Sequence, residues 1–182
     1  MAERLLAGLK RLNRWIAVAV GIGLVLAAGF VLLDIALRQV GSSLGGTDEI
    51  SGYVMAIATA WGMGFALMEL AHVRIDLLRV RAGARLRAVF DLGAMFVLSL
   101  VVSLIGWHSW PVVSRTIDNG SRANTPLETP LVLVQMPWFL GWVWFALVSW
   151  LTLVACLVLV LRGRFDTSET YIGAFNEVDA NT

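Results

Sequence analysis

The chain has 182 residues, of which 58% are hydrophobic and 15% are charged, and its formal net charge is +1. Soluble globular domains have nearer half apolar and a quarter charged residues, so this composition indicates a membrane protein rather than a soluble one. The balanced charge gives no reason to expect nucleic-acid binding, and the single cysteine, Cys156, excludes an intrachain disulfide.

Four stretches without Lys, Arg, Asp or Glu are each long enough to cross a bilayer as a helix. They are residues 15–33, 50–68, 92–113 and 129–161. A helix rises about 1.5 Å per residue and the hydrocarbon core is roughly 30 Å thick, so 19 or more residues suffice. We therefore predict an all-α integral membrane protein with a four-helix transmembrane domain over residues 15–161.

Basic residues are distributed unevenly between the segments that flank these helices. Four precede the first helix, five lie between the second and third, and two follow the fourth, whereas the other two connections hold three. Because Lys and Arg are enriched on the cytoplasmic side, both termini are predicted to be cytoplasmic. Residues 1–14 are then a cytoplasmic N-terminus, and residues 162–182 a cytoplasmic, flexible tail. The first stretch lacks an Ala-x-Ala-like cleavage site, which favours a retained helix over a signal peptide.

The second helix is predicted to open at Thr47, after a glycine-rich loop. Threonine suits an N-cap, and Asp48 and Glu49 in the first turn suit the positive end of the helix. These two acids could also face a partner protein in the periplasm. Both interpretations stay open.

Two adjacent stripes of small residues run along the second helix. They are Ala56, Ala60 and Gly64 in one stripe, and Ala58, Gly62 and Ala66 in the other. In lipid, close approach of backbones at small residues is a main source of helix association. We predict that one stripe meets the chain's own bundle and that the other meets a larger membrane partner, with Gly62 as the sharpest probe.

Charged residues gather near the predicted helix ends, where each has a neighbour one helical turn away. The pairs are Asp34 with Arg38, Glu69 with His72, and Arg87 with Asp91. No carboxylate falls at the midpoint of a span, as a proton relay or sodium site formed by this chain alone would require. The pattern therefore argues against a self-sufficient transporter.

The fourth stretch is too long for one span, since 33 helical residues would extend roughly 50 Å. Pro130 and Pro137 interrupt it, so we predict a short interfacial segment over residues 131–135 and a span that begins near Pro137. Five tryptophans are then expected near the periplasmic boundary as lipid anchors. They are Trp107, Trp110, Trp138, Trp142 and Trp144.

The two histidines are placed poorly for a cofactor. His72 is predicted at the inner end of the second helix and His108 near the outer end of the third, so they cannot share one haem iron. Neither has a second ligand at suitable spacing for a metal. We therefore predict no catalytic, cofactor-binding or metal-binding residue, and no enzyme.

Four short motifs occur in an informative order along the chain. They are Ala36-Leu37-Arg38-Gln39-Val40, Thr47-Asp48-Glu49 followed by Tyr53, His72-Val73-Arg74-Ile75-Asp76-Leu77, and the prolines Pro130 and Pro137. This order resembles the DctQ-like family, the small membrane subunit of tripartite ATP-independent periplasmic (TRAP) transporters. Gln39 and Gly46 depart from the resemblance, since the family often has Tyr and Trp at these positions.

The resemblance implies a role in a larger complex in the bacterial cell inner membrane. In this family a periplasmic substrate-binding protein delivers an organic anion, a carboxylate or sulfonate, to a large membrane subunit that moves it with sodium. The resemblance implies that this chain scaffolds the large subunit, helps to dock the binding protein and contacts membrane lipids. Alternatives are the membrane-anchor subunit of a redox complex and a stand-alone four-helix membrane protein.

Ten residues are the candidates for structural or interface roles. They are Arg38, Asp48, Glu49, Gly62, Gly64, His72, Arg74, Asp76, Pro130 and Pro137. Among them, the resemblance and the position at the headgroup boundary predict that His72, Arg74 and Asp76 form a polar cluster at the inner end of the second helix. Arg74 is expected to pair with a carboxylate of the partner or with lipid phosphate.

Overall fold

The computed structural model describes residues 1–72, 79 and 81–173. In these residues the secondary structure is helical apart from one isolated bridge between Arg122 and Pro130. Four long helices, α1 (Ala2–Gln39), α2 (Thr47–Met68), α3 (Ala84–Asn119) and α4 (Val132–Leu161), precede a short helix, α5 (Phe165–Ile172). All four long helices are apolar and long enough to cross a membrane. The predicted all-α fold with four spanning helices is confirmed.

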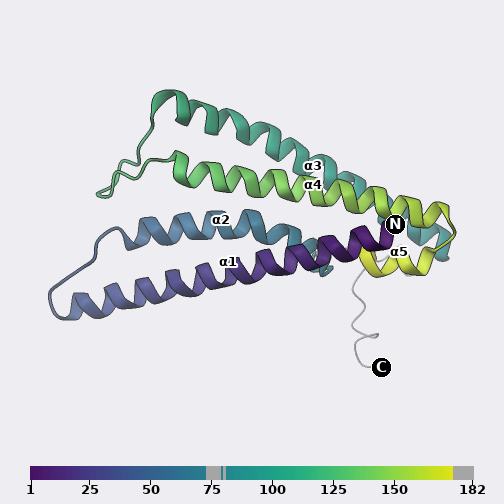
Figure 1. Cartoon of the computed structure of the whole chain (residues 1–182), viewed down its shortest axis with the longest axis horizontal. Coiled ribbons are helices and arrows are strands. Elements are labelled where there is room, and N and C mark those ends of the chain that lie inside the picture. The colour runs from purple at the N-terminus through teal and green to yellow at the C-terminus, as the bar shows by residue number, and fades with distance from the viewer. Residues whose placement is uncertain (73–78, 80, 174–182) are drawn as a thin grey trace.

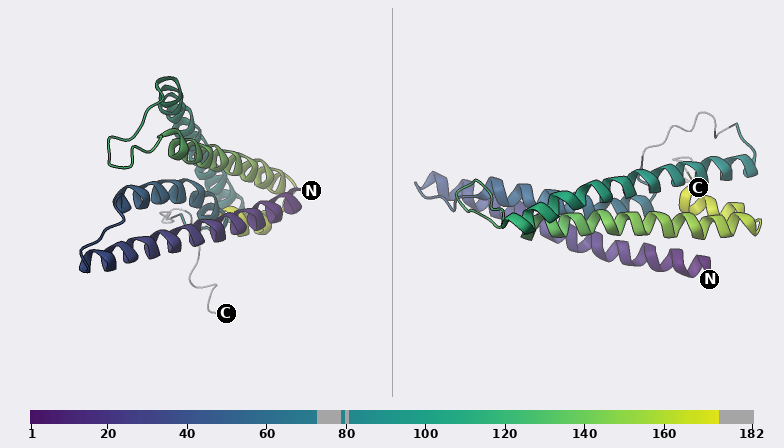
Figure 2. Two further views of the ribbon diagram at one scale, coloured as in Figure 1. Left: turned by 60° about the vertical axis from the view of Figure 1, so that its left-hand side comes forward. Right: turned by 90° about the horizontal axis from the view of Figure 1, so that it is seen from above.

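The long helices form two hairpins, α1 with α2 and α3 with α4 (Figure 1). One end of the bundle holds the N-terminus and α5, and we call it the terminal end. The opposite end holds the connections 40–46 and 120–131, and we call it the loop end. The hairpins diverge towards the loop end (Figure 1), while contacts of α4 with α2 and α1 join them. A further view shows α5 lying beside α4 at the terminal end (Figure 2).

The helix α1 is longer than its apolar stretch. It begins at Ala2 rather than near residue 15, because the preceding residues are good helix formers and bury Leu6, Leu9 and Asn13 on one face. Further along, the most apolar part of α1 holds no buried residue. This part of α1 therefore exposes apolar side chains that water would not tolerate, as expected for a membrane helix.

The segment predicted to lie at the membrane interface is helical and continuous with the fourth span. The helix α4 begins at Val132 and continues through Pro137 without a break, while Pro130 lies just before it. Proline in the second turn removes a single backbone hydrogen bond, which the rest of this long helix tolerates. The Pro137 carbonyl also accepts a hydrogen bond from Trp61 Nε1 at 2.9 Å, which ties α4 to α2.

The first part of the predicted tail is helical. Residues 165–172 form α5, which packs against both α3 and α4. Ser168 and Ile172, four positions apart, are buried on its inner face. A helix of only two turns is unstable alone, so its stability depends on this packing.

Candidate interaction surfaces and their polar anchors

A buried carboxylate fixes the connection between α1 and α2 at the loop end. Asp34, of which 1% of the side chain is exposed, accepts a salt bridge from Arg38 at 2.7 Å. It also accepts hydrogen bonds from Ser43 Oγ at 2.9 Å, the Leu44 backbone N–H at 2.7 Å and Thr47 Oγ1 at 3.0 Å. The predicted pairing of Asp34 with Arg38 is confirmed. The same carboxylate also binds the connection that follows α1 and the first residue of α2.

The start of α2 differs from the predicted cap. Thr47 is the first residue of the helix, and Gly46 precedes it in the left-handed conformation with a φ of 67°. The Thr47 hydroxyl donates to Asp34 instead of accepting from its own first turn, so the prediction of Thr47 as N-cap is wrong. Gly46 also lies directly against Leu127 of the α3–α4 connection, where a Cβ atom would collide with the leucine.

The two acids that follow Thr47 have different surroundings. Asp48 is exposed, whereas Glu49 is half-buried and accepts a hydrogen bond from Tyr53 Oη at 2.6 Å. The side chain of Arg38 is 54% exposed at the same end. The loop end therefore exposes a negative charge at Asp48 and a positive charge at Arg38, close to the connection that is fixed by hydrogen bonds to Asp34.

The first small-residue stripe of α2 lies inside the bundle. A Cβ atom on Gly64 would lie 2.5 Å from Asn13 Oδ1, and Ala60 is fully buried. The Ala60 methyl would lie 2.7 Å from a Cβ atom on Gly141 of α4. Small residues therefore permit the close approach of α1, α2 and α4.

A buried asparagine sits at this junction. Asn13 is fully buried, donates to the Leu9 carbonyl at 2.9 Å and accepts from Trp144 Nε1 at 3.1 Å. Because Asn13 lies in the terminal half of α1, this hydrogen bond places Trp144 beside that half of the helix. The sequence signal that could have identified Asn13 is its helical spacing from Leu6 and Leu9 on one face.

The second stripe faces outward. No atom lies within 4 Å of where a Cβ on Gly62 would stand. Gly62 lines a lateral groove of about 460 Å³ between α1 and α2, together with Gly21 and Ala58. The two stripes thus have different environments: Gly64 is in the core and Gly62 is on an open apolar face.

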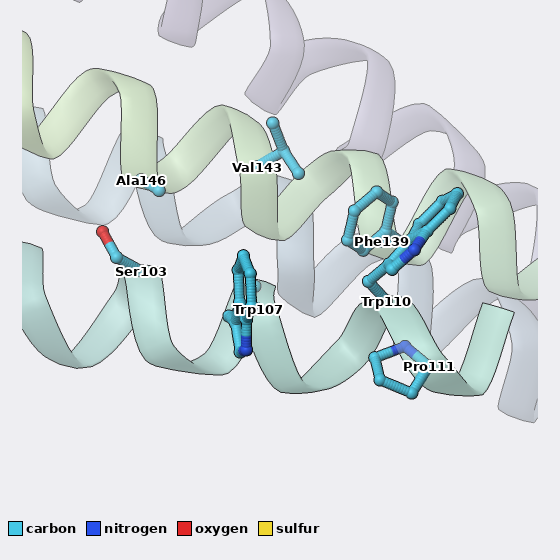
Figure 3. Close-up of a pocket in the computed structure, with 8 residues that line it drawn as sticks. Ser103, Trp107, Trp110, Pro111, Phe139, Val143 and Ala146 are labelled. Atoms are coloured by element: carbon cyan, nitrogen blue, oxygen red, sulfur yellow. The ribbon is translucent and has the colours of Figure 1, made fainter. Parts of the chain in front are cut away.

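Two further lateral grooves are also apolar. One, of about 380 Å³, lies between α1 and α2 and includes Gly23 and Trp61. The other, of about 460 Å³, lies between α3 and α4, where the rings of Trp107, Trp110 and Phe139 gather (Figure 3). Trp107 is 77% exposed. None of these three grooves is lined by an ionisable side chain of the described residues.

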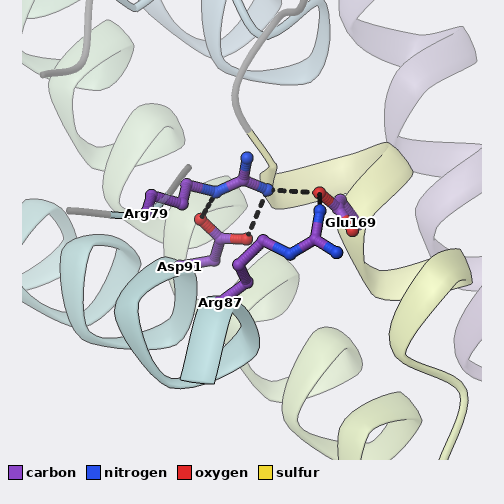
Figure 4. Close-up of polar contacts among 4 residues, drawn as sticks. All are labelled: Arg79, Arg87, Asp91 and Glu169. Carbon is purple, nitrogen blue, oxygen red and sulfur yellow. Dashed lines mark hydrogen bonds and ion pairs between the residues drawn. The ribbon is translucent and has the colours of Figure 1, made fainter. Parts of the chain in front are cut away.

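A charged network joins three segments at the terminal end (Figure 4). Arg79, from the α2–α3 connection, binds the carboxylate of Asp91 on α3 through two hydrogen bonds of 2.8 and 3.1 Å. Its Nη2 also donates to Glu169 of α5 at 2.6 Å, and Arg87 Nη1 contacts the same Glu169 oxygen at 3.3 Å. Hydrogen bonding to Asp91 raises the pKa of the Arg79 guanidinium, so Arg79 stays charged.

This network replaces one pair predicted from helical spacing. Asp91 pairs with Arg79 and not with Arg87, because a guanidinium that meets both carboxylate oxygens binds more strongly than a single exposed contact. The contact of Arg79 with Glu169 spans 90 positions, which local spacing cannot predict. The helical spacing of the apolar residues Phe165 and Ile172 is a sequence signal that could have indicated α5.

The predicted cluster around His72 is only partly covered by the structure. The His72 ring stacks on Phe145 of α4, with ring centroids 6.0 Å apart. Glu69, expected to neighbour His72, forms an ion pair with Lys10 at 3.0 Å. Arg74 and Asp76 lie outside the described residues, so the cluster stays a prediction. Among the residues the structure describes, no three His, Cys, Asp or Glu side chains come together to hold a metal ion.

Comparison with known proteins identifies the family. No curated protein and no solved structure gives a significant match to the chain. A family model does match, that of the DctQ component of tripartite ATP-independent periplasmic transporters, over residues 27–159. This range includes the last third of α1, all of α2 and α3, and nearly all of α4. The chain therefore belongs to the DctQ family, the small membrane component of TRAP transporters.

Proposed function

We propose that this chain is the small membrane subunit of a sodium-coupled TRAP transporter for organic anions and that it scaffolds the large membrane subunit. The observation that carries the proposal is the outward apolar surface of α1 and α2. The chain belongs to a family whose transporters have other components, and such a component could cover this surface. The most apolar part of α1 buries no residue, and Gly62 of α2 lies open beside it. A face of this kind requires lipid or another membrane protein as its surroundings.

Rigidity is the property that a scaffold needs, and polar contacts supply it along the bundle. Asp34 holds the loop end, the Asn13–Trp144 hydrogen bond joins α1 to α4, and Arg79 ties the terminal end. In this proposal, the moving part of the large subunit works against this fixed body. The absence of ionisable residues from the three described grooves supports an accessory role, because a path for an anion or sodium requires polar ligands.

We also propose that the loop end helps to dock the periplasmic binding protein. Asp48 is exposed there, and Arg38 is half-exposed beside the buried Asp34. Charged groups on a surface fixed by internal hydrogen bonds can select a partner of complementary charge without first being ordered. This assignment places the loop end in the periplasm and the terminal end in the cytoplasm of a bacterial inner membrane.

The proposed orientation is tested by labelling single cysteines in a Cys156→Ser background. A cysteine in place of exposed Ser42 is expected to react with a membrane-impermeant maleimide in intact spheroplasts, whereas one in place of exposed Arg85 is expected to react only after permeabilisation. Labelling at Arg85→Cys in intact spheroplasts would contradict the orientation. The reaction of each variant after permeabilisation controls for the reactivity of its thiol.

The scaffold role is tested by removing the chain from the transporter. Deleting its gene is expected to abolish uptake of the transported anion, and re-expression of the full chain is expected to restore it. Calorimetry with the purified chain and the same anion is expected to show no saturable heat, since this subunit supplies no anion site of its own. Normal uptake after deletion would overturn the scaffold role, and saturable heat would overturn the accessory one.

A further inference from the structure

The tail helix α5 contacts α4, which directly precedes it, and two parts of the chain that are distant in sequence, α3 and Arg79. A tight turn at Gly163, with a φ of 72°, reverses the chain after α4 and allows α5 to pack on α3 and α4. Ile172 and Ser168 are buried in this contact. Through Glu169, α5 also reaches Arg79 of the α2–α3 connection.

We propose that α5 is a clasp that holds Arg79 and the start of α3 in place. Arg79 is 7% exposed, and its guanidinium lies between Asp91 of α3 and Glu169 of α5. Glu169 in turn accepts from both Arg79 and Arg87. Arg79 lies before the start of α3, and Arg87 lies in its first turn. The four side chains balance two positive against two negative charges, so removing Glu169 leaves a net positive charge on the network, in which Arg79 and Asp91 are buried and Arg87 is partly exposed.

Gly173, the residue that follows α5, lies close to this contact. A Cβ atom on Gly173 would collide with the Glu169 carbonyl and would lie 3.1 Å from Arg79 Nη2. A side chain at position 173 would therefore disturb Glu169 and crowd the Arg79 guanidinium. This steric fit is independent of the ion pairs and supports the same arrangement.

The clasp has a consequence for the connection that carries the His72-to-Asp76 motif. His72, at one end of this stretch, stacks on Phe145 of α4, and Arg79, just beyond its other end, is held by Asp91 and Glu169. Both anchor points are thus set by contacts outside the connection itself. Releasing α5 removes one of the two carboxylates that bind Arg79. Both carboxylates belong to this chain, so the clasp forms without a partner protein.

Hydrogen exchange on the full-length chain in detergent, followed by mass spectrometry, tests the clasp. Glu169→Gln is expected to speed exchange in residues 165–172 and in residues 84–92 by about tenfold, because the glutamine oxygen can still accept from Arg79 but lacks the negative charge that strengthens the bond. Exchange in α2 is expected to stay unchanged. Asp166→Asn is the matched control, because it removes the same charge from an exposed position of the same helix.

Two outcomes would overturn the proposal. Faster exchange confined to residues 165–172 would make α5 a docked appendage that fixes nothing else, and unchanged exchange in both segments would remove the role of Glu169. Gly173→Ala provides a second test that leaves every charge in place, in case Glu169→Gln does not fold. It is expected to speed exchange in the same two segments, and no change in residues 84–92 would again exclude a clasp.

Discussion

Asp91→Ala is expected to lower the free energy of unfolding by about 3 kcal/mol, because it leaves the buried Arg79 guanidinium without its two-bond partner. This is the lower end of the range for breaking a buried ion pair, since Glu169 still accepts one hydrogen bond from Arg79. Titration of the detergent-solubilised chain with sodium dodecyl sulfate, followed by tryptophan fluorescence, measures the loss. Asp118→Ala, an exposed position on the same helix, is expected to change the midpoint little.

The double variant Arg79→Met/Asp91→Leu separates the charge from the packing. Replacing both partners of a buried pair with apolar side chains is often neutral or stabilising, whereas removing one partner is costly. We therefore expect the double variant to recover most of the stability that Asp91→Ala loses. If it is as unstable as the single variant, the loss arises from disturbed packing around α3, and the explanation by an unpaired cation is wrong.

The spans could be predicted from sequence, but their ends could not. Runs of apolar residues identify membrane helices because lipid requires the same apolar character along a whole span. The helices α1 and α3 extend beyond their apolar stretches. There, ordinary helix-forming residues such as those around Leu6 continue the helix without a run of apolar residues to mark it. At α4, the effect of a proline on the helix depends on its position. Pro137 lies in the second turn, where the helix tolerates the loss of one backbone hydrogen bond.

Contacts between side chains were predictable only where they are local. Asp34 and Arg38 pair as their spacing on one helix suggests. Asp34 also accepts from three more donors, two in the following connection and one at the start of α2. Asp91 had a local candidate in Arg87 but binds Arg79, whose position depends on how the α2–α3 connection folds back. Tertiary structure therefore decides which of several available cations a buried carboxylate meets.

The two glycines Gly62 and Gly64 provide the sharpest test of where the large subunit binds. They lie two positions apart on α2, and leucine raises helix propensity at both by a similar amount, about 1 kcal/mol. Their surroundings differ, since Gly64 meets Asn13 and Gly62 faces an open groove. Gly64→Leu is expected to unfold the isolated chain. The leucine displaces Asn13 from its hydrogen bond with Trp144, and the overpacking of the junction costs about 1–3 kcal/mol in addition.

Gly62→Leu is expected to leave the isolated chain folded and to reduce its co-purification with a tagged large subunit. A leucine there would hold the partner's backbone away from α2 by about one side-chain thickness, at a cost of about 1–3 kcal/mol, or a five- to hundredfold weaker complex. Gly93→Leu, at another exposed glycine with open space around it on α3, is the control for an added apolar side chain. If Gly62→Leu leaves both folding and co-purification intact, α2 faces lipid at this position and the large subunit binds another face of the bundle.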